Sequence, residues 1–99
     1  MGFKKEKYEV LKRLLLGNYL HEARSSISEK NLLQTGKVSA ETVAKIINKA
    51  RGGDYSTSPH HFVDNIEVHI LRKVTYENKS WYIKWYSLEP DLFFISVHA

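Results

Sequence analysis

Three runs of alternating apolar and polar residues near the end of the chain constrain its fold more than any other feature. They cover residues 65–73, 80–88 and 91–99, and each is rich in β-branched or aromatic side chains. A period of two residues is typical of β-strands that bury one face. The connections at 77–79 and 89–91 are short and carry turn residues, so we expect an antiparallel meander of three strands.

The residues before Gly52-Gly53 follow a helical pattern instead. Spacing near i, i+3, i+4 predicts a helix over 3–16 that ends at Gly17, and Ser39 is a good N-cap for a helix over 39–50. A short helix over 28–34 and a loop over 52–62 complete the expected elements. The expected buried stripes are Tyr8, Leu11, Leu15 and Leu16, with Phe3 and Val10 nearby, in the first helix, and Val43, Ile46 and Ile47 in the helix after Ser39. We therefore expect a single α+β domain over residues 1–99, with N-terminal helices packed on one face of a C-terminal antiparallel sheet.

Composition limits the classes of function. The 99 residues contain no cysteine, which excludes disulfides and thiolate metal sites. Fifteen Lys and Arg against eleven Asp and Glu give a formal net charge of +4, which favours a polyanionic partner. No stretch is apolar enough for a signal peptide or a membrane span, so we expect a cytoplasmic protein without membrane contact.

Strand alternation also predicts which side chains share a face. If the helices cover Trp81, Ile83 and Trp85, the opposite face should carry polar and ionisable groups. The expected members of this open face are Glu67, His69, Tyr82, Lys84, Tyr86, Ser96 and His98. Lysine can neutralise phosphate, tyrosine can stack on unpaired bases, and histidine can transfer protons near neutral pH, so the set suits RNA. The solvated face of an ordinary antiparallel sheet has the same composition.

The string TSPHHF (57–62) places two adjacent histidines, His60 and His61, just before the first predicted strand. Adjacent histidines can move protons, contact phosphate or lie in a solvated loop. A zinc site is a weak alternative, because the spacing of the histidines matches no common signature. The sequence has no glycine-rich phosphate loop and no recognisable nucleophile motif.

The chain resembles the MqsR-type toxins of bacterial toxin–antitoxin pairs, which are small mRNA interferases with the RelE-like α+β fold. The strings that carry the resemblance are LKRLLLGNYLHEARSSISEKNLLQ (11–34), VSAETVAKIINKARGGDYSTS (38–58) and the terminal pair WYIKWYSL and LFFISVH. The resemblance implies a strand tyrosine at the RNA-cleaving site (Tyr82), a basic strand position (Lys84) and a basic residue closing the last strand (His98). Tyr55 matches an aromatic loop position, but Ser56 stands where the family has a catalytic lysine. A glutamine of the first strand is also missing near Glu67 or Val68.

Together these features predict a toxin that cleaves single-stranded mRNA without metal or cofactor, and that a cognate antitoxin protein covers in the resting cell. The expected catalytic residues are His60, His61, Tyr82 and His98, and the expected RNA- or phosphate-binding residues are Arg51, Tyr55, Arg72, Lys84 and Tyr86. The alternative is a small non-catalytic module that binds nucleic acid or protein. Such a module would need the basic surface and the tyrosines but no paired histidines.

Overall fold

The computed structural model describes residues 3–22, 30–60 and 63–99. Their elements are helix α1 (Phe3–Leu16), strand β1 (Leu20–His21), helix α3 (Ala40–Lys49), the 3₁₀ helix η1 (Gly52–Asp54) and strands β2 (Tyr55–Pro59), β3 (Glu67–Tyr76), β4 (Lys79–Leu88) and β5 (Asp91–His98). The predicted short helix over 28–34 falls partly outside the described residues. Neither helix in the described part of the chain has the length and apolar character that a membrane crossing requires.

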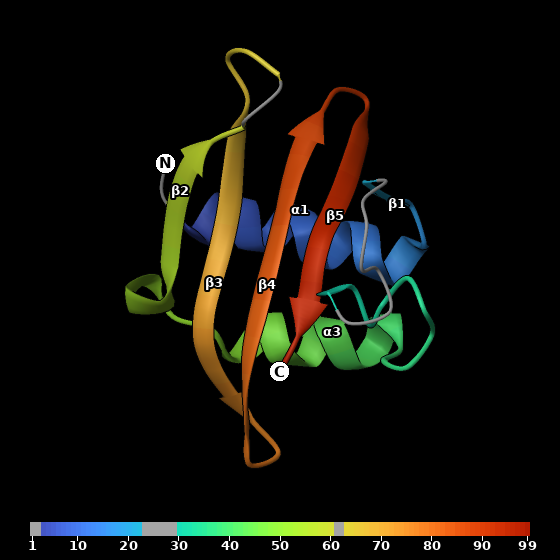
Figure 1. Ribbon diagram of the computed structural model, residues 1–99, viewed down its shortest axis with the longest axis vertical. Coiled ribbons are helices and arrows are strands. Elements are labelled where there is room, and N and C mark those ends of the chain that lie inside the picture. Colours follow the sequence, from blue (N-terminus) through green and yellow to red (C-terminus); the bar gives the residue numbers. More distant parts are fainter. Residues whose placement is uncertain (1–2, 23–29, 61–62) are drawn as a thin grey trace.

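The strands form one five-stranded sheet in the order β1-β5-β4-β3-β2 (Figure 1). Strands β3, β4 and β5 form the predicted antiparallel meander, and Glu77 and Asn78 adopt positive φ in the hairpin turn between β3 and β4. The α+β class is therefore confirmed. Two details of the prediction are wrong: β1 pairs in parallel with β5, which makes the sheet mixed, and β1 precedes α3, so the helices do not all come before the sheet.

Strand β2 lies within the stretch that was expected to be a loop. Tyr55 to Pro59 pair with β3 along its outer edge. The hydroxylated residues of this stretch are typical of turns, yet Tyr and Thr also favour strands when a neighbour offers free backbone groups. Its partner strand is the next one along the chain, beginning at Glu67, but the composition of residues 55–59 alone does not reveal that they pair with it.

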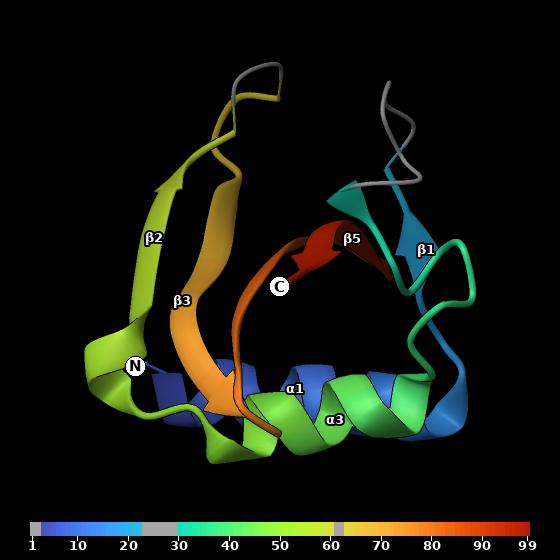
Figure 2. The same ribbon diagram turned by 60° about the horizontal axis from the view of Figure 1, so that its bottom comes forward.

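Helices α1 and α3 lie side by side against one face of the sheet, and the sheet curves so that its opposite face is concave (Figure 2). Ser39 caps α3 as predicted, because its Oγ accepts a hydrogen bond from the Thr42 amide at 3.1 Å. The main core lies between the helices and the convex face of the sheet. Its most deeply buried members are Val10, Val43, Ile46, Ile47, Leu71, Ile83, Trp85, Phe94 and Val97.

The predicted stripe of α1 is displaced by about one residue. Phe3 and Val10 are buried as expected, and Leu11 packs against the core. Leu14, which was not predicted, is buried as well, whereas Tyr8, Leu15 and Leu16 are 69%, 71% and 69% exposed. The three consecutive leucines at 14–16 are compatible with more than one helical stripe, and the position of α3 and the sheet decides which one is buried. Gly17 ends the helix with a positive φ of 70°, as predicted.

The predicted assignment of faces is correct for β4 and wrong for β3. His69 pairs with Trp85, and paired residues share a face, so His69 points toward the helices. Val68 and Ile70 lie on the concave face instead, where they form a second buried cluster with Tyr86 and Ile95. In β5, a register shift against Lys84/Trp85 places Leu92, Phe94 and Val97 in the main core. The alternating pattern of the sequence alone does not predict such a bulge, and one extra residue reverses the face toward which every later residue of the strand points.

Candidate functional site

The concave face gathers polar side chains at the end of the sheet where β5 finishes. Tyr82 is the register partner of His98, and Lys84 is the register partner of Ser96. The Tyr82 and His98 ring centroids lie 5.2 Å apart. These four side chains and Lys30 line a shallow hollow of about 400 Å³, which we call the cationic end of the concave face. Three of the predicted site residues, Tyr82, Lys84 and His98, therefore lie together.

Lys30 was not predicted, and buried Asn31 explains its position. Asn31 is fully buried and forms a parallel bridge with Val97. Its Oδ1 accepts a hydrogen bond from the Gln34 amide at 3.1 Å, and its Nδ2 lies 3.1 Å from Nδ1 of His21. Burial lowers the pKa of His21, which favours the neutral ring that can accept this hydrogen bond. The anchored Asn31 brings Lys30 beside the end of β5, and local sequence signals do not predict that Lys30 and His98 lie together.

The cationic end combines the groups that phosphodiester chemistry requires. Two ammonium groups, on Lys30 and Lys84, can neutralise a phosphate. The imidazole of His98 is a candidate general acid or base, and the Tyr82 hydroxyl beside it is a second proton donor. The exposed part of the Tyr82 ring can also stack on an unpaired base.

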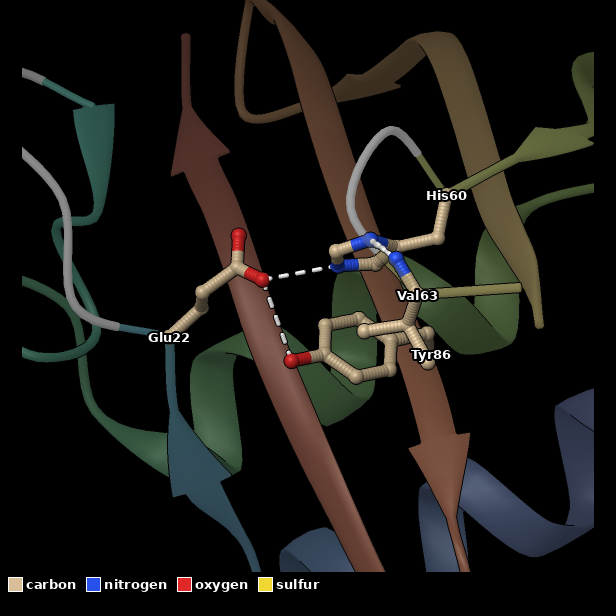
Figure 3. Close-up of polar contacts among 4 residues, drawn as sticks. All are labelled: Glu22, His60, Val63 and Tyr86. Carbon is tan, nitrogen blue, oxygen red and sulfur yellow. Dashed lines mark hydrogen bonds and ion pairs between the residues drawn. The ribbon is translucent and has the colours of Figure 1, made fainter.

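The other end of the concave face is closed by a carboxylate that two side chains share (Figure 3). Glu22 Oε2 lies 2.8 Å from Nε2 of His60 and accepts a hydrogen bond from the Tyr86 hydroxyl at 3.0 Å. Glu22 follows β1 and His60 follows β2, the two opposite edge strands of the sheet, while Tyr86 belongs to β4 between them. This group, which we call the Glu22 clamp, therefore joins the two edges of the sheet across its concave face.

The clamp determines the tautomer of His60. Its Nδ1 accepts a hydrogen bond from the Val63 amide at 3.1 Å, so Nε2 carries the proton and donates it to Glu22. Burial, together with the hydrogen bond to the Glu22 carboxylate, raises the pKa of Tyr86 to about 12, which keeps its hydroxyl protonated as a donor. Both nitrogens of His60 are thus engaged in holding the concave face together.

His60 and His98 lie at opposite ends of the concave face. His60 packs on Tyr86, with ring centroids 4.7 Å apart, and His98 packs on Tyr82. Tyr82 and Tyr86 are four strand residues apart, which corresponds to about 13 Å. The structure therefore does not bring His60 and His98 together as an acid–base pair around one phosphate. His61 lies outside the described residues.

Tyr55 lies on the opposite side of the sheet from the cationic end. Its ring stacks on Phe3 at 4.8 Å, and its hydroxyl lies 2.6 Å from Nδ1 of His69. Nε2 of His69 is 3.4 Å from Oε1 of Glu6, so the histidine joins β2 and β3 to α1. Burial raises the pKa of Tyr55 to about 12 and lowers the pKa of His69. These shifts favour a protonated phenol that donates to a neutral imidazole, which is a structural arrangement.

The two predicted arginines lie at the edge of the sheet. Arg72 donates from Nη1 to Oγ of Ser56 at 3.3 Å, and Ser56 is the register partner of Ile70, so Arg72 lies at the rim of the concave face. Arg51 directly precedes η1 and lines a different hollow, together with Lys73. In the described ranges, no three His, Asp or Glu side chains gather as a metal-binding group would.

Comparison with known proteins does not assign this surface. No protein-family model, no curated protein and no solved structure matches the chain.

Proposed function

We propose that this protein is an endoribonuclease that cleaves single-stranded mRNA at the cationic end of its concave face without a metal ion. The observation that carries the proposal is the grouping of His98, Tyr82 and Lys84, joined by Lys30, around one shallow open hollow. An open hollow suits an extended, flexible strand better than it suits a small metabolite, which proteins usually enclose.

The chemistry follows from the groups present. The ribose 2′-oxygen attacks the adjacent phosphorus while His98 removes the 2′-hydroxyl proton. Lys84 and Lys30 neutralise the charge that develops on the phosphoryl oxygens. The P–O5′ bond breaks as Tyr82 donates its hydroxyl proton to the leaving oxygen, and protonated His98 then returns a proton to Tyr82. The products are a 2′,3′-cyclic phosphate and a free 5′-hydroxyl.

The biological role that we propose is that of a toxin in a bacterial toxin–antitoxin pair, with a RelE-like arrangement of the fold. The support is a helical layer on one face of the sheet and a concave opposite face (Figure 2), one end of which carries Lys30 and Lys84, together with the sequence resemblance to MqsR-type toxins. In this role the protein acts on cytoplasmic mRNA. A cognate antitoxin would prevent cleavage by covering the concave face or the helical side.

The test compares matched variants on an end-labelled single-stranded RNA in the presence of a metal chelator. His98→Ala and Tyr82→Phe should each lower the cleavage rate by roughly 10²–10⁴, the contribution expected of a general acid or base. Tyr8→Phe and Lys45→Ala are matched controls, because these residues lie on α1 and α3, away from the concave face. Both controls should cleave at the wild-type rate.

The same assay distinguishes the alternative, a non-catalytic module that binds nucleic acid or protein. If the wild-type protein binds RNA but leaves it intact, and if binding depends on Lys84 and not on His98, the module is correct and the proposed nuclease is wrong. The engagement of both His60 nitrogens in the clamp is the observation that favours this alternative, because it removes one of the predicted catalytic histidines.

A further inference from the structure

A second hollow, of about 600 Å³, lies where the end of α3, η1 and β3 meet. Among its lining residues are four cations and one carboxylate: Lys7, Lys49, Arg51, Lys73 and Asp54. Arg51 was expected to bind phosphate, but the structure places it here and not beside Tyr82 and His98. This surface is therefore separate from the proposed cleavage site.

The charge of this hollow is not neutralised from within. Asp54, whose carboxylate accepts a hydrogen bond from the Arg51 amide at 2.9 Å, supplies one negative charge against four positive ones. The Lys7 ammonium donates to the carbonyl oxygens of Asn48 and Ala50, at 2.8 Å and 3.0 Å, and so offsets the negative end of the α3 dipole.

Three cations remain available, namely Lys49, Arg51 and Lys73, which we call the basic edge. All three are exposed. Within residues 3–22, 30–60 and 63–99, no carboxylate forms an ion pair with any of them. An approaching anion therefore meets uncompensated positive charge at this edge.

A bulge in β3 connects the basic edge to the concave face. The register between β3 and β4 shifts between Leu71 and Val74, and Lys73 adopts a positive φ of 56°. Arg72 lies at the rim of the concave face, where it contacts Ser56, while Lys73 lines the second hollow. The bulge thus presents two consecutive cations on the two sides of the sheet edge. Cationic side chains therefore continue from Lys84 across β3 to Arg51.

The spacing of these cations suits a polymer. Adjacent strands lie about 4.8 Å apart, so β3 is roughly 10 Å from β5, and the basic edge lies farther still from His98. A single phosphate at the cleavage site could not reach it, whereas a strand several nucleotides long could. The cations of the basic edge are exposed, which is typical of a surface that follows a flexible phosphate backbone.

We propose that the basic edge binds the phosphate backbone of the same RNA strand, several nucleotides away from the bond that is cleaved. This inference rests on the proposed function, because it takes RNA as the polyanion. It adds a second contact region, and it predicts that substrate length, in addition to the sequence at the cleavage site, determines affinity.

The experiment measures binding of fluorescent 2′-O-methyl RNA, which lacks the attacking hydroxyl and cannot be cleaved by the proposed route. Oligonucleotides of 3 and 12 nucleotides are titrated with wild type, with the variant Lys49→Gln/Arg51→Gln/Lys73→Gln, and with Lys4→Gln/Lys5→Gln/Lys12→Gln. The last variant removes the same number of charges from exposed positions on α1 and is the matched control.

The basic-edge variant should bind the 12-mer more than tenfold more weakly than wild type at low salt. The slope of log K against log salt should fall by about 2, since each lost phosphate contact on a single strand contributes roughly 0.7. Binding of the 3-mer, and binding by the control variant, should change by less than threefold. Equal weakening by the two triple variants would overturn the inference, because it would show a general effect of net charge.

Two further outcomes distinguish the backbone contact at the basic edge from the proposed cleavage site and from a membrane-binding surface. If His98→Ala cleaves RNA normally while the basic-edge variant still loses affinity for the 12-mer, the proposed cleavage site is wrong but the backbone contact stands. If the basic-edge variant binds the 12-mer like wild type and instead loses binding to vesicles that contain anionic lipid, the surface faces a membrane and the inference is wrong.

Discussion

The Glu22 clamp gives the most specific prediction about how this fold is held together. The change is Glu22→Gln, which removes the negative charge but keeps the size of the side chain. The shared Oε2 atom makes two contacts, to His60 and to Tyr86, and hydrogen bonds to a charged group contribute about 1.5–3 kcal/mol each. The Glu22 side chain is 27% exposed and that of His60 only 5%. Water can therefore replace a lost hydrogen bond at Glu22 but not at His60.

We expect Glu22→Gln to lower the free energy of unfolding by about 2–3 kcal/mol, after allowance for solvent and for the hydrogen bonds that the amide can still make. For a chain of this size, that loss lowers Tm by roughly 10–20 °C. Urea denaturation followed by tryptophan fluorescence measures the free energy. Glu9→Gln is the matched control, because the Glu9 side chain is 44% exposed and its i,i+4 pair with Arg13, at 3.1 Å, is of a kind that contributes only about 0.3–0.5 kcal/mol.

A double-mutant cycle shows whether the clamp itself is responsible. Tyr86→Phe removes the hydroxyl that donates to Glu22, and the combined variant should be more stable than the sum of the two losses predicts, by about 1–2 kcal/mol. Additive losses would show that Glu22 and Tyr86 do not interact. A loss below 0.5 kcal/mol for Glu22→Gln alone would refute the reasoning, since removal of an exposed ion pair already costs about that much.

Three other predictions follow from the structure. Leu14→Ala should destabilise the protein by about 2–5 kcal/mol, whereas Leu15→Ala should change stability by less than about 0.5 kcal/mol, and urea denaturation of both variants tests which face of α1 is buried. Burial lowers the pKa of His69 in the folded protein, so its contribution to stability is present above the unfolded value of 6.5 and is lost as the pH falls through the lower folded value. His69→Gln should therefore reduce the loss in the free energy of unfolding on acidification, and an unchanged loss would contradict the burial of a neutral His69. The pKa of Tyr86 is raised from 10.0 to about 12, so its contribution is present below pH 10 and is lost as the pH rises toward 12; Tyr86→Phe should reduce the loss of stability across that interval.

Local signals in the sequence predict several elements of this fold correctly. Alternation identified Trp81, Ile83 and Trp85 as the covered side of β4, and Ser39 was correctly placed as the cap of α3. Both signals act over a few residues, and the interactions that produce them are local. The grouping of Tyr82, Lys84 and His98 also follows from strand parity and short hairpins, which need no long-range information.

The errors share a physical cause, which is that pairing with another segment of the chain decides them. The two residues of β1 form a strand because β5 offers a free edge, and the residues from Tyr55 to Pro59 do so because β3 offers another. The facing of His69 depends on its register with Trp85. Glu22 was not recognised as important, because its role appears only when segments that follow two opposite edge strands meet over Tyr86.

The chemical nature of the RNA ends after cleavage tests the central claim most directly. A single-stranded RNA is incubated with purified wild-type protein and excess chelator, and the fragments are analysed by mass spectrometry. Attack by the 2′-hydroxyl at the cationic end predicts a 2′,3′-cyclic phosphate on one fragment and a 5′-hydroxyl on the other, with neither formed by His98→Ala. Intact RNA, or fragments that carry 5′-phosphate and 3′-hydroxyl ends, would contradict the proposed reaction.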